Sequence, residues 1–303
     1  MLQYLFAKKK IVACWSFCLL CWTAEAAAAQ TTAEKVIEKI TRTGKLTAGT
    51  SKDALPFAFR NAEGELVGYS VDILKLITKQ LEQQYNQEIE LELAALQPKE
   101  RIPKLIEGEV DIVCDASSFT WKRDRQVDFS FSYSSTGTRL LTTPENDFWD
   151  ADSLVNKRIG ALAKTTNERT IRRVQPQAEI VIVKDRAAGY EALQQGELDA
   201  FASDGILLES WLQTVPNPED FRIVGDYSRE GIACMVAENN SQFLNVVNYT
   251  LVEFMQGFLN DKPKYVTIFE QWFGPQGVLP LTQDLRNIMI DNMQLLIDFK
   301  DQI

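Results

Sequence analysis

The sequence contains no histidine, and this absence excludes several classes of catalytic site. Ser-His-Asp and Cys-His enzymes use an imidazole as general base, and many zinc sites use it as a ligand. A glycine-rich phosphate-binding loop is also missing from the sequence. These absences exclude the commonest enzyme classes, and we expect no catalytic residue, no metal and no cofactor.

Basic residues are in the minority: 32 Lys and Arg against 42 Asp and Glu give the chain a net charge of −10. Such an acidic surface disfavours binding to nucleic acid or to an anionic membrane. It still permits a small anionic ligand in a local basic pocket. With 303 residues, the chain is long enough for two domains of ordinary size.

Cysteine is scarce, and three of the five cysteines lie near the N-terminus. Lys8–Lys10 precede an apolar run from Ile11 to Trp22, and an alanine-rich tract follows. This order is typical of a secretory signal peptide, which we assign to residues 1–29 with cleavage after Ala26 or Ala29. An uncleaved membrane anchor is the alternative, although the apolar run is short for a helix that spans a bilayer.

The other two cysteines, Cys114 and Cys234, lie far apart in a chain that is predicted to be exported. In an oxidising compartment they can form one disulfide, or they can remain as two buried thiols. The sequence leaves both alternatives open.

Strand and helix patterns alternate along the rest of the chain, which indicates an α/β fold. We expect strands at 45–50, 88–94, 110–114, 158–162, 179–183, 198–202, 221–224 and 231–237, and helices at 69–85, 99–107, 167–174, 187–195, 206–212, 243–259, 264–273 and 285–299. The alternation restarts after the threonine-rich stretch 134–143, which indicates one lobe interrupted by an inserted second lobe.

We place the first lobe at residues 30–137 and 231–303 and the inserted lobe at residues 138–230. The chain is expected to cross between them near Gly137–Arg139 and Arg229–Ile232. The last predicted helix either packs on the first lobe or mediates contact between copies, and the sequence does not decide between these roles.

Several short motifs occur in a characteristic order. They are Gly49–Phe57 (GTSKDALPF), Gly64–Asp72 (GELVGYSVD), Arg101–Asp111 (RIPKLIEGEVD), Ser117-Ser118 with Arg123, Asp128–Ser130, Gly137–Leu141 and Gly231–Cys234. In order and spacing they resemble the periplasmic solute-binding proteins of family 3, which capture polar amino acids for ABC importers. The last two motifs are most similar to the glutamate/aspartate-binding branch. The resemblance runs from about Ile37 to Phe273.

The resemblance implies the periplasmic binding protein type 2 fold, in which two Rossmann-like lobes joined by a two-segment hinge close over a ligand. It also implies a periplasmic protein that binds a small-molecule amino acid and delivers it to the membrane permease and ATPase of an importer. We expect a monomer with no nucleic-acid partner.

The resemblance assigns a site for the α-carboxylate of the ligand. Arg123 stands where the family has its carboxylate-binding arginine, with Ser117 and Ser118 in the ligand-binding turn. A guanidinium offers two parallel donors that match a carboxylate, which lysine does not. Thr165 and Thr166 precede a predicted helix, whose free N–H groups suit a carboxylate. The alternatives are a solvated arginine in a charged run and an ordinary helix N-cap.

For the α-ammonium group, the family places an acidic residue at Asp204, just after a predicted strand. Asp115 is a second candidate, and a helix N-cap is the alternative role for Asp204. Phe57 and Tyr69 are candidates for an apolar wall around the stem of the ligand, with packing in the core as their alternative.

The residues that recognise the ligand's side chain are assigned from the glutamate/aspartate branch. Arg101 matches one of its cations, Arg186 replaces a histidine, and Ser51, with Lys52 beside it, replaces an arginine. These matches favour an acidic side chain, with a polar neutral side chain or broad specificity as the alternative. Arg101 also has an alternative as a residue on the surface of a helix.

Two other functions are known for this architecture. A dehydratase-like enzyme of the same fold needs a positioned proton donor with a tuned pKa, and no such pair stands out in the sequence. A ligand-sensing protein that acts through a membrane receptor is the other alternative.

Overall fold

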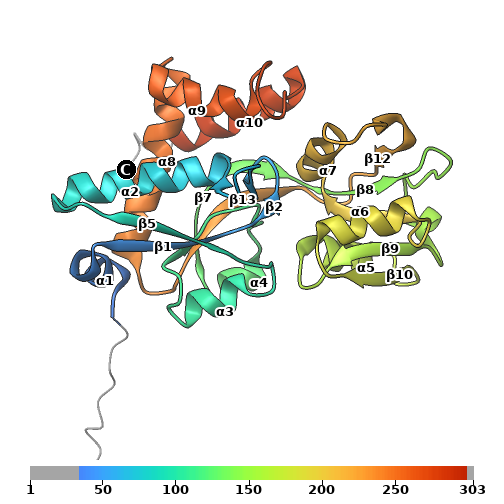
Figure 1. Cartoon of the computed structure of the whole chain (residues 1–303), viewed down its shortest axis with the longest axis horizontal. Coiled ribbons are helices and arrows are strands. Elements are labelled where there is room, and N and C mark those ends of the chain that lie inside the picture. Colours follow the sequence, from blue (N-terminus) through green and yellow to red (C-terminus); the bar gives the residue numbers. More distant parts are fainter. Residues whose placement is uncertain (1–33, 299–303) are drawn as a thin grey trace, which may run out of the picture. The chain divides into compact units, whose positions relative to one another are not determined.

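The computed structural model of the protein describes residues 34–298. Two five-stranded mixed sheets with helices packed on them form two lobes of an α/β fold (Figure 1). The signal peptide predicted at residues 1–29 and the final residue of the last predicted helix lie outside the described residues. No helix in the range 34–298 is both long enough and apolar enough to cross a membrane.

The sheet of the first lobe has the strand order β5-β1-β6-β13-β7. Its strands are β1 (Lys45–Thr50), β5 (Glu90–Ala95), β6 (Ile112–Val113), β7 (Asp128–Thr136) and β13 (Glu230–Val236). β1 pairs in parallel with β5 and β6, whereas β13 runs antiparallel to β6 and β7. A small antiparallel sheet formed by β2 (Asp53–Ala54), β3 (Ala58–Arg60) and β4 (Leu66–Val67) follows β1.

The helices of the first lobe come from both ends of the described chain. They are α1 (Val36–Thr43), α2 (Tyr69–Tyr85), α3 (Arg101–Ile106), α4 (Trp121–Asp124), α8 (Ser241–Leu259), α9 (Pro263–Phe273) and α10 (Gln283–Asp298). In α2, residues at helical spacing such as Ile73, Ile77 and Leu81 are fully buried, and Asn86 ends the helix in the left-handed conformation. Each such buried side chain contributes about 1.5–3 kcal/mol of transfer free energy.

The sheet of the second lobe has the strand order β10-β9-β11-β8-β12. Its strands are β8 (Thr138–Thr142), β9 (Arg158–Leu162), β10 (Glu179–Val183), β11 (Ala200–Asp204) and β12 (Arg222–Val224). Its helices are α5 (Thr166–Val174), α6 (Arg186–Gln194) and α7 (Gly205–Leu212), with short 3₁₀ turns η1 (Asp152–Leu154) and η2 (Pro218–Asp220). Apolar side chains pack on both faces of the sheet, for example Leu140 and Ile159 on one face and Leu141 and Phe201 on the other.

Two chain segments connect the sheets. Gly137 lies between β7 and β8, and residues 225–229 lie between β12 and β13. The two segments bond to each other, because the Thr138 N–H donates to Ser228 Oγ (2.9 Å) and the Tyr227 N–H donates to Thr138 O (3.0 Å). A Cβ atom on Gly137 would lie 1.9 Å from Ser228 O, so only glycine allows this close approach.

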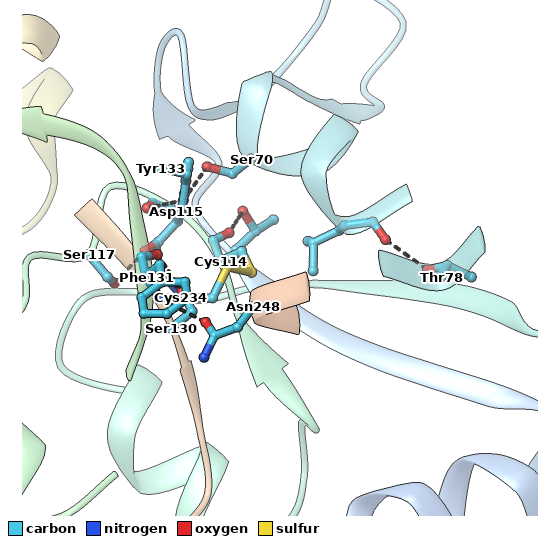
Figure 2. Close-up of a disulfide and its surroundings, with 12 residues drawn as sticks. Ser70, Thr78, Cys114, Asp115, Ser117, Ser130, Phe131, Tyr133, Cys234 and Asn248 are labelled. Atoms are coloured by element: carbon cyan, nitrogen blue, oxygen red, sulfur yellow. Dashed lines mark hydrogen bonds between the residues drawn. A yellow bond between two sulfur atoms is a disulfide. The ribbon is translucent and has the colours of Figure 1, made fainter. Parts of the chain in front are cut away.

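Cys114 and Cys234 form a disulfide, which decides between the two alternatives that the sequence left open (Figure 2). The bond joins the end of β6 to β13 across a sequence separation of 120 residues. Both cysteines are fully buried, and the Cys234 N–H donates to Ser130 Oγ on β7 (2.9 Å). The disulfide therefore joins central strands of the first lobe that lie before and after the second lobe in the sequence.

The final helix, α10, packs against α8 of the first lobe, which is one of the two roles considered for it (Figure 1). Met289 and Met293 are buried in the core of this lobe. Arg286 forms an ion pair with Glu270, and its guanidinium lies 5.3 Å from the centroid of the Phe269 ring.

Candidate ligand-binding site

Arg123 lies in α4, a short helix capped by the Thr120 hydroxyl. Its Nη1 donates to Ser118 O (2.8 Å), and its Nη2 lies 3.4 Å from Lys164 O of the second lobe. The residue is only 9% exposed, so it is not the solvated arginine considered as the alternative. Within residues 34–298, Arg123 forms no ion pair with a carboxylate. Burial, with the nearby charge of Arg101, lowers the pKa of Arg123 to about 10.

The two predicted serines lie beside Arg123, in the turn that follows β6. Ser117 O accepts a hydrogen bond from the Ala233 N–H (3.0 Å), and Ser118 forms a β-bridge with Ile232. Both serines are buried. The turn is thus held against β13, and this contact fixes the carbonyl of Ser118 that orients the guanidinium of Arg123.

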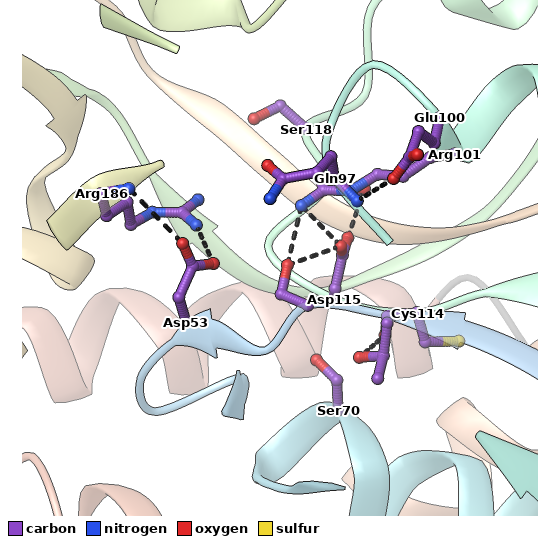
Figure 3. Close-up of polar contacts among 12 residues, drawn as sticks. Asp53, Ser70, Gln97, Glu100, Arg101, Cys114, Asp115, Ser118 and Arg186 are labelled. Atoms are coloured by element: carbon purple, nitrogen blue, oxygen red, sulfur yellow. Dashed lines mark hydrogen bonds and ion pairs between the residues drawn. The ribbon is translucent and has the colours of Figure 1, made fainter. Parts of the chain in front are cut away.

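Arg101 and Asp115 form a buried ion pair in the first lobe, with Nη2 2.7 Å from Oδ2 (Figure 3). Ser51 Oγ accepts from Arg101 Nη2 (2.8 Å) and donates to Asp115 (3.0 Å). Ser117 Oγ accepts from Arg101 Nη1 (3.2 Å) and donates to the other oxygen of Asp115. We call these four residues the Arg101–Asp115 cluster. Sequence reasoning assigned three of them to ligand contact and kept Asp115 as a second ammonium candidate.

The burial of this cluster excludes a helix-surface position for Arg101, which is 4% exposed. Burial lowers the pKa of Arg101, and the charge of Asp115 opposes that effect. The Nε atom of Arg101 is buried and has no hydrogen-bond partner in the described structure. Asp115 therefore balances the charge of Arg101, while one donor of the guanidinium remains available.

Thr165 is the N-cap of α5, the role considered as its alternative. Its hydroxyl accepts from the Glu168 N–H (3.2 Å) and donates to Leu162 O (2.8 Å). Thr166 is the first residue of the helix, and both threonines are buried. This N-cap role leaves other N–H groups of the first turn without helical partners, so it is compatible with a carboxylate nearby.

Asp204 is the last residue of β11 and immediately precedes α7, but its side chain does not cap that helix. It is 4% exposed, and its Oδ1 atom is buried with no hydrogen-bond partner in the described part of the chain. Burial and the charge of Glu230 raise the pKa of Asp204 to about 7, against the effects of Arg186 and a hydrogen bond with Asn167. A buried acceptor without a donor is costly, and an ammonium group is a suitable donor.

Glu230 is a second carboxylate in this region, and sequence reasoning missed it. It begins β13, where the chain returns from the second lobe, and its Oε1 accepts from Ser228 Oγ (2.6 Å). Its Oε2 is buried and lacks a hydrogen-bond partner within residues 34–298. The Thr138 hydroxyl oxygen lies 3.5 Å from Glu230 Oε1 and 2.8 Å from Asn167 Oδ1. The available signal was its position directly before the Gly231–Cys234 motif.

Arg186 begins α6 in the second lobe, and it pairs with Asp53 of β2 in the first lobe (Figure 3). Arg186 Nη1 lies 2.7 Å from Asp53 Oδ1. Arg186 is 5% exposed, and its Nε atom has no hydrogen-bond partner in the described structure. Sequence reasoning assigned Arg186 to the ligand's side chain and did not identify Asp53.

Phe57 and Tyr69 are fully buried in the core of the first lobe. The Tyr69 ring packs edge-on against Phe273, with centroids 4.9 Å apart, and its hydroxyl donates to Tyr133 O (3.2 Å). Core packing therefore accounts for both residues, and their contact with a ligand remains a prediction.

The described site combines one buried guanidinium that has no acidic partner with two carboxylates that each carry an unpaired oxygen. These groups are suited to a ligand with both a carboxylate and a cationic group, because buried charges are stable only when they are paired. Among the described residues, no group of His, Cys, Asp and Glu side chains is arranged to hold a metal ion.

Residues 46–275 match the family model described as bacterial extracellular solute-binding proteins, family 3. The L-glutamate/L-aspartate-binding protein of Pseudomonas aeruginosa is 28% identical over 268 residues, which cover 84% of this chain and 87% of that protein. A glutamine-binding protein of Geobacillus stearothermophilus is 30% identical over 197 residues, which cover 64% of this chain and 73% of that protein.

Among solved structures, an ancestral arginine-binding protein bound to arginine matches with a TM-score of 0.68 at 28% identity, covering 76% of this chain and 99% of that chain. The likeness confirms the periplasmic binding protein type 2 fold that the sequence motifs implied. The family model covers well over half of the chain. The protein therefore belongs to the bacterial extracellular solute-binding proteins of family 3, and it is a binding protein rather than an enzyme.

Proposed function

We propose that this protein is the periplasmic amino-acid-binding subunit of an ABC importer. The observation that carries the proposal is the buried guanidinium of Arg123, which has no acidic partner in the described structure, together with the unpaired oxygens of Asp204 and Glu230. A free amino acid supplies the two missing partners, a carboxylate for Arg123 and an ammonium group for Asp204. The names of the relatives, which bind glutamate, aspartate or glutamine, support this class of ligand.

The α-carboxylate is proposed to lie between the two lobes. Arg123 and Ser118 contact it from the first lobe, while Thr165, Thr166 and the N-terminus of α5 contact it from the second lobe. The bond between Arg123 and Lys164 O already brings these two segments within hydrogen-bond distance. A carboxylate in this position gains charge-assisted hydrogen bonds from both lobes.

For the ligand's side chain, we propose glutamate or aspartate. Arg101 and Arg186 each have a buried Nε donor without an acceptor, and a side-chain carboxylate can accept hydrogen bonds from both. Ser51 belongs to the Arg101–Asp115 cluster and is proposed to contact the same end of the ligand. The relative from Pseudomonas aeruginosa supports this choice.

An uncharged amide side chain is the second candidate, and one specific observation favours it. Asp115 and Asp53 already balance the charges of Arg101 and Arg186. A side-chain amide can use the remaining donors without adding a third carboxylate to this region. The glutamine-binding relative agrees with this alternative.

The binding mechanism is proposed to be a population shift between open and closed lobes. The described residues before 138 and after 230 form one lobe, residues 138–230 form the other, and a ligand held by both favours closure. The protein acts as a monomer that delivers its ligand to the membrane permease. Micromolar affinity corresponds to about −8 kcal/mol, which a few charge-assisted contacts can supply after ordering costs.

The test is a thermal-shift screen against the twenty amino acids, after removal of bound ligand by unfolding and refolding. A ligand at 100 times its Kd adds about 2.7 kcal/mol and raises Tm by several degrees. A rise with glutamate or aspartate supports both the class and the acidic side chain. A rise with glutamine alone keeps the class and favours the second candidate, whereas no rise with any amino acid refutes the proposal.

A further inference from the structure

Asp53 lies where the first lobe approaches Arg186 of the second lobe. The chain leaves β1 through Ser51, which belongs to the Arg101–Asp115 cluster, and reaches Asp53 two residues later. Figure 3 shows the Asp53 carboxylate directed at the guanidinium of Arg186, with the Arg101–Asp115 cluster on the same side of the first lobe. Asp53 is therefore next to the residues that we propose for recognition of the ligand's side chain.

The carboxylate of Asp53 interacts with both the guanidinium charge of Arg186 and the N-terminus of helix α6. Nη1 of Arg186 lies 2.7 Å from Oδ1 of Asp53, and the backbone N–H of Arg186 lies 3.5 Å from Oδ2. That N–H belongs to the first turn of the nine-residue helix α6, where the helix dipole also favours a negative charge. Asp53 thus occupies the position near Arg186 that is most favourable for a second carboxylate.

We propose that Asp53 determines the charge selectivity of the side-chain end of the site, because its carboxylate competes with the side-chain carboxylate of an acidic ligand for Arg186. This inference rests on the proposed amino-acid-binding function. An acidic side chain must displace Asp53 or share one guanidinium with it, and two carboxylates so close together repel each other. An amide side chain meets no such repulsion.

A ligand can displace the side chain of Asp53 more easily than that of Asp115, the other aspartate that pairs with an arginine in this site. Asp115 is fully buried and also accepts hydrogen bonds from Ser51 and Ser117. The Asp53 side chain retains 28% exposure, and its hydrogen bonds in the described part of the chain go to Arg186. Asp53 can therefore turn toward water when a ligand takes its place, whereas Asp115 is held from several sides.

The test compares Kd values for glutamate and glutamine in the wild type and in Asp53→Asn by isothermal titration calorimetry. The variant keeps the shape of the side chain and removes its charge. We expect the ratio of the glutamine Kd to the glutamate Kd to rise at least tenfold in Asp53→Asn. Asp220→Asn, which removes a charge from the exposed η2 turn of the second lobe, is the matched control and should leave the ratio within threefold.

A double-mutant cycle shows whether the effect passes through Arg186. In an Arg186→Gln background, Asp53→Asn should change the ratio less than threefold. An unchanged ratio in Asp53→Asn, an equal gain for both ligands, or the same shift in the Arg186→Gln background overturns the inference. Asp53→Ala, measured in parallel with thermal unfolding, replaces Asp53→Asn if the latter fails to fold.

The two proposals fail in different ways. A wild-type protein that binds no amino acid refutes the proposed function. A wild-type protein that binds glutamate or glutamine, with a ratio that Asp53→Asn does not alter, leaves the proposed function in place and refutes the role of Asp53. A wild-type protein that binds another amino acid but neither glutamate nor glutamine also refutes the role of Asp53.

Discussion

Arg123 differs from the other two arginines of the site in its partners. Arg101 and Arg186 each pair with an aspartate, whereas Arg123 donates to the backbone carbonyls of Ser118 and Lys164. A guanidinium with such partners can accept a ligand carboxylate without first losing an internal ion pair. This difference makes Arg123 the residue whose loss should affect binding most and folding least.

Arg123→Ala should abolish measurable binding of the best ligand from the amino-acid screen, because a carboxylate left unpaired inside a closed site costs several kcal/mol. Arg123→Lys should weaken binding at least tenfold, since an ammonium group lacks the two parallel donors. Both variants should unfold within a few degrees of the wild type. Calorimetric titration and thermal unfolding measure these effects, and an affinity of Arg123→Ala within a few-fold of the wild type contradicts the assignment.

The raised pKa of Asp204 predicts that both the stability of the protein and its affinity for the ligand depend on pH. This pKa is raised from 3.8 to about 7, mainly by burial and also by the charge of Glu230. The charges of Arg186 and Arg101 and a hydrogen bond with Asn167 lower the pKa and partly oppose this effect. Because the raised pKa belongs to the folded state, the unliganded protein should lose stability as pH rises from about 4 to about 7. A ligand ammonium group favours the ionised carboxylate, so affinity should fall roughly tenfold for each pH unit below 7.

Calorimetric titrations between pH 5.5 and 8 measure this dependence, and buffers of different ionisation enthalpy report the proton released on binding. Asp204→Asn is the control, since an amide does not titrate in this range. Affinity that stays constant from pH 5.5 to 8 in the wild type would show that Asp204 does not bind the ammonium group.

At the scale of helices and strands, regular apolar patterns were sufficient for prediction. The strands at 45–50, 158–162 and 179–183 and the helix at 69–85 have the bounds expected from the sequence. The sequence prediction missed α1, the small β2-β3-β4 sheet, β7 and β8. Strands such as β2 and β4, each two residues long, are too short to show a period, so only their pairing defines them.

Sequence motifs predicted the site residues that lie in one local segment, but they did not predict the ion pairs formed by tertiary contacts. Arg123 and Ser118 lie together because they belong to one local turn and helix. The partners of Arg186 and Arg101 depend on tertiary contacts with Asp53 and Asp115 across separations of 133 residues and 14 positions along the chain, respectively. Local sequence patterns do not report which acid neutralises which arginine.

The disulfide is the element that joins β6 to β13, and its removal should weaken the first lobe. Replacement of Cys114 and Cys234 together by alanine should lower the free energy of unfolding by about 2–5 kcal/mol, because the bond closes a long loop in the unfolded chain. Urea unfolding monitored by circular dichroism measures the change. Reductant should lower the stability of the wild type and leave the double variant unaffected, and a loss below about 1 kcal/mol would contradict the prediction.

At the scale of the whole described molecule, the proposed closure depends on groups that both lobes contribute. Polar contacts between the lobes at the site include Asp53 with Arg186 and Arg123 with Lys164 O. Moving a two-state equilibrium from 1:99 to 99:1 needs about 5.5 kcal/mol of differential binding. A ligand of micromolar affinity binds with about −8 kcal/mol. It can supply the differential binding needed for closure only if both lobes contact it.

Gly137 tests this dependence on closure, because it lies where the two connecting segments touch. An alanine Cβ there would lie 1.9 Å from Ser228 O, a backbone atom that cannot move without separating the segments. Gly137→Ala should therefore cost about 1–3 kcal/mol of stability and weaken ligand binding at least tenfold. Gly64→Ala is the matched control: Gly64 has φ +82° in the turn between β3 and β4, and an added Cβ there has nothing within 4 Å.

The control should lose about 1 kcal/mol of stability through backbone strain while its ligand affinity stays within threefold of the wild type. Calorimetric titration and thermal unfolding of both variants separate the two effects. If Gly137→Ala loses stability but binds as tightly as Gly64→Ala, the connecting segments are only a structural joint. If its affinity falls beyond that of the control, the approach of these segments is part of how the lobes close on the ligand.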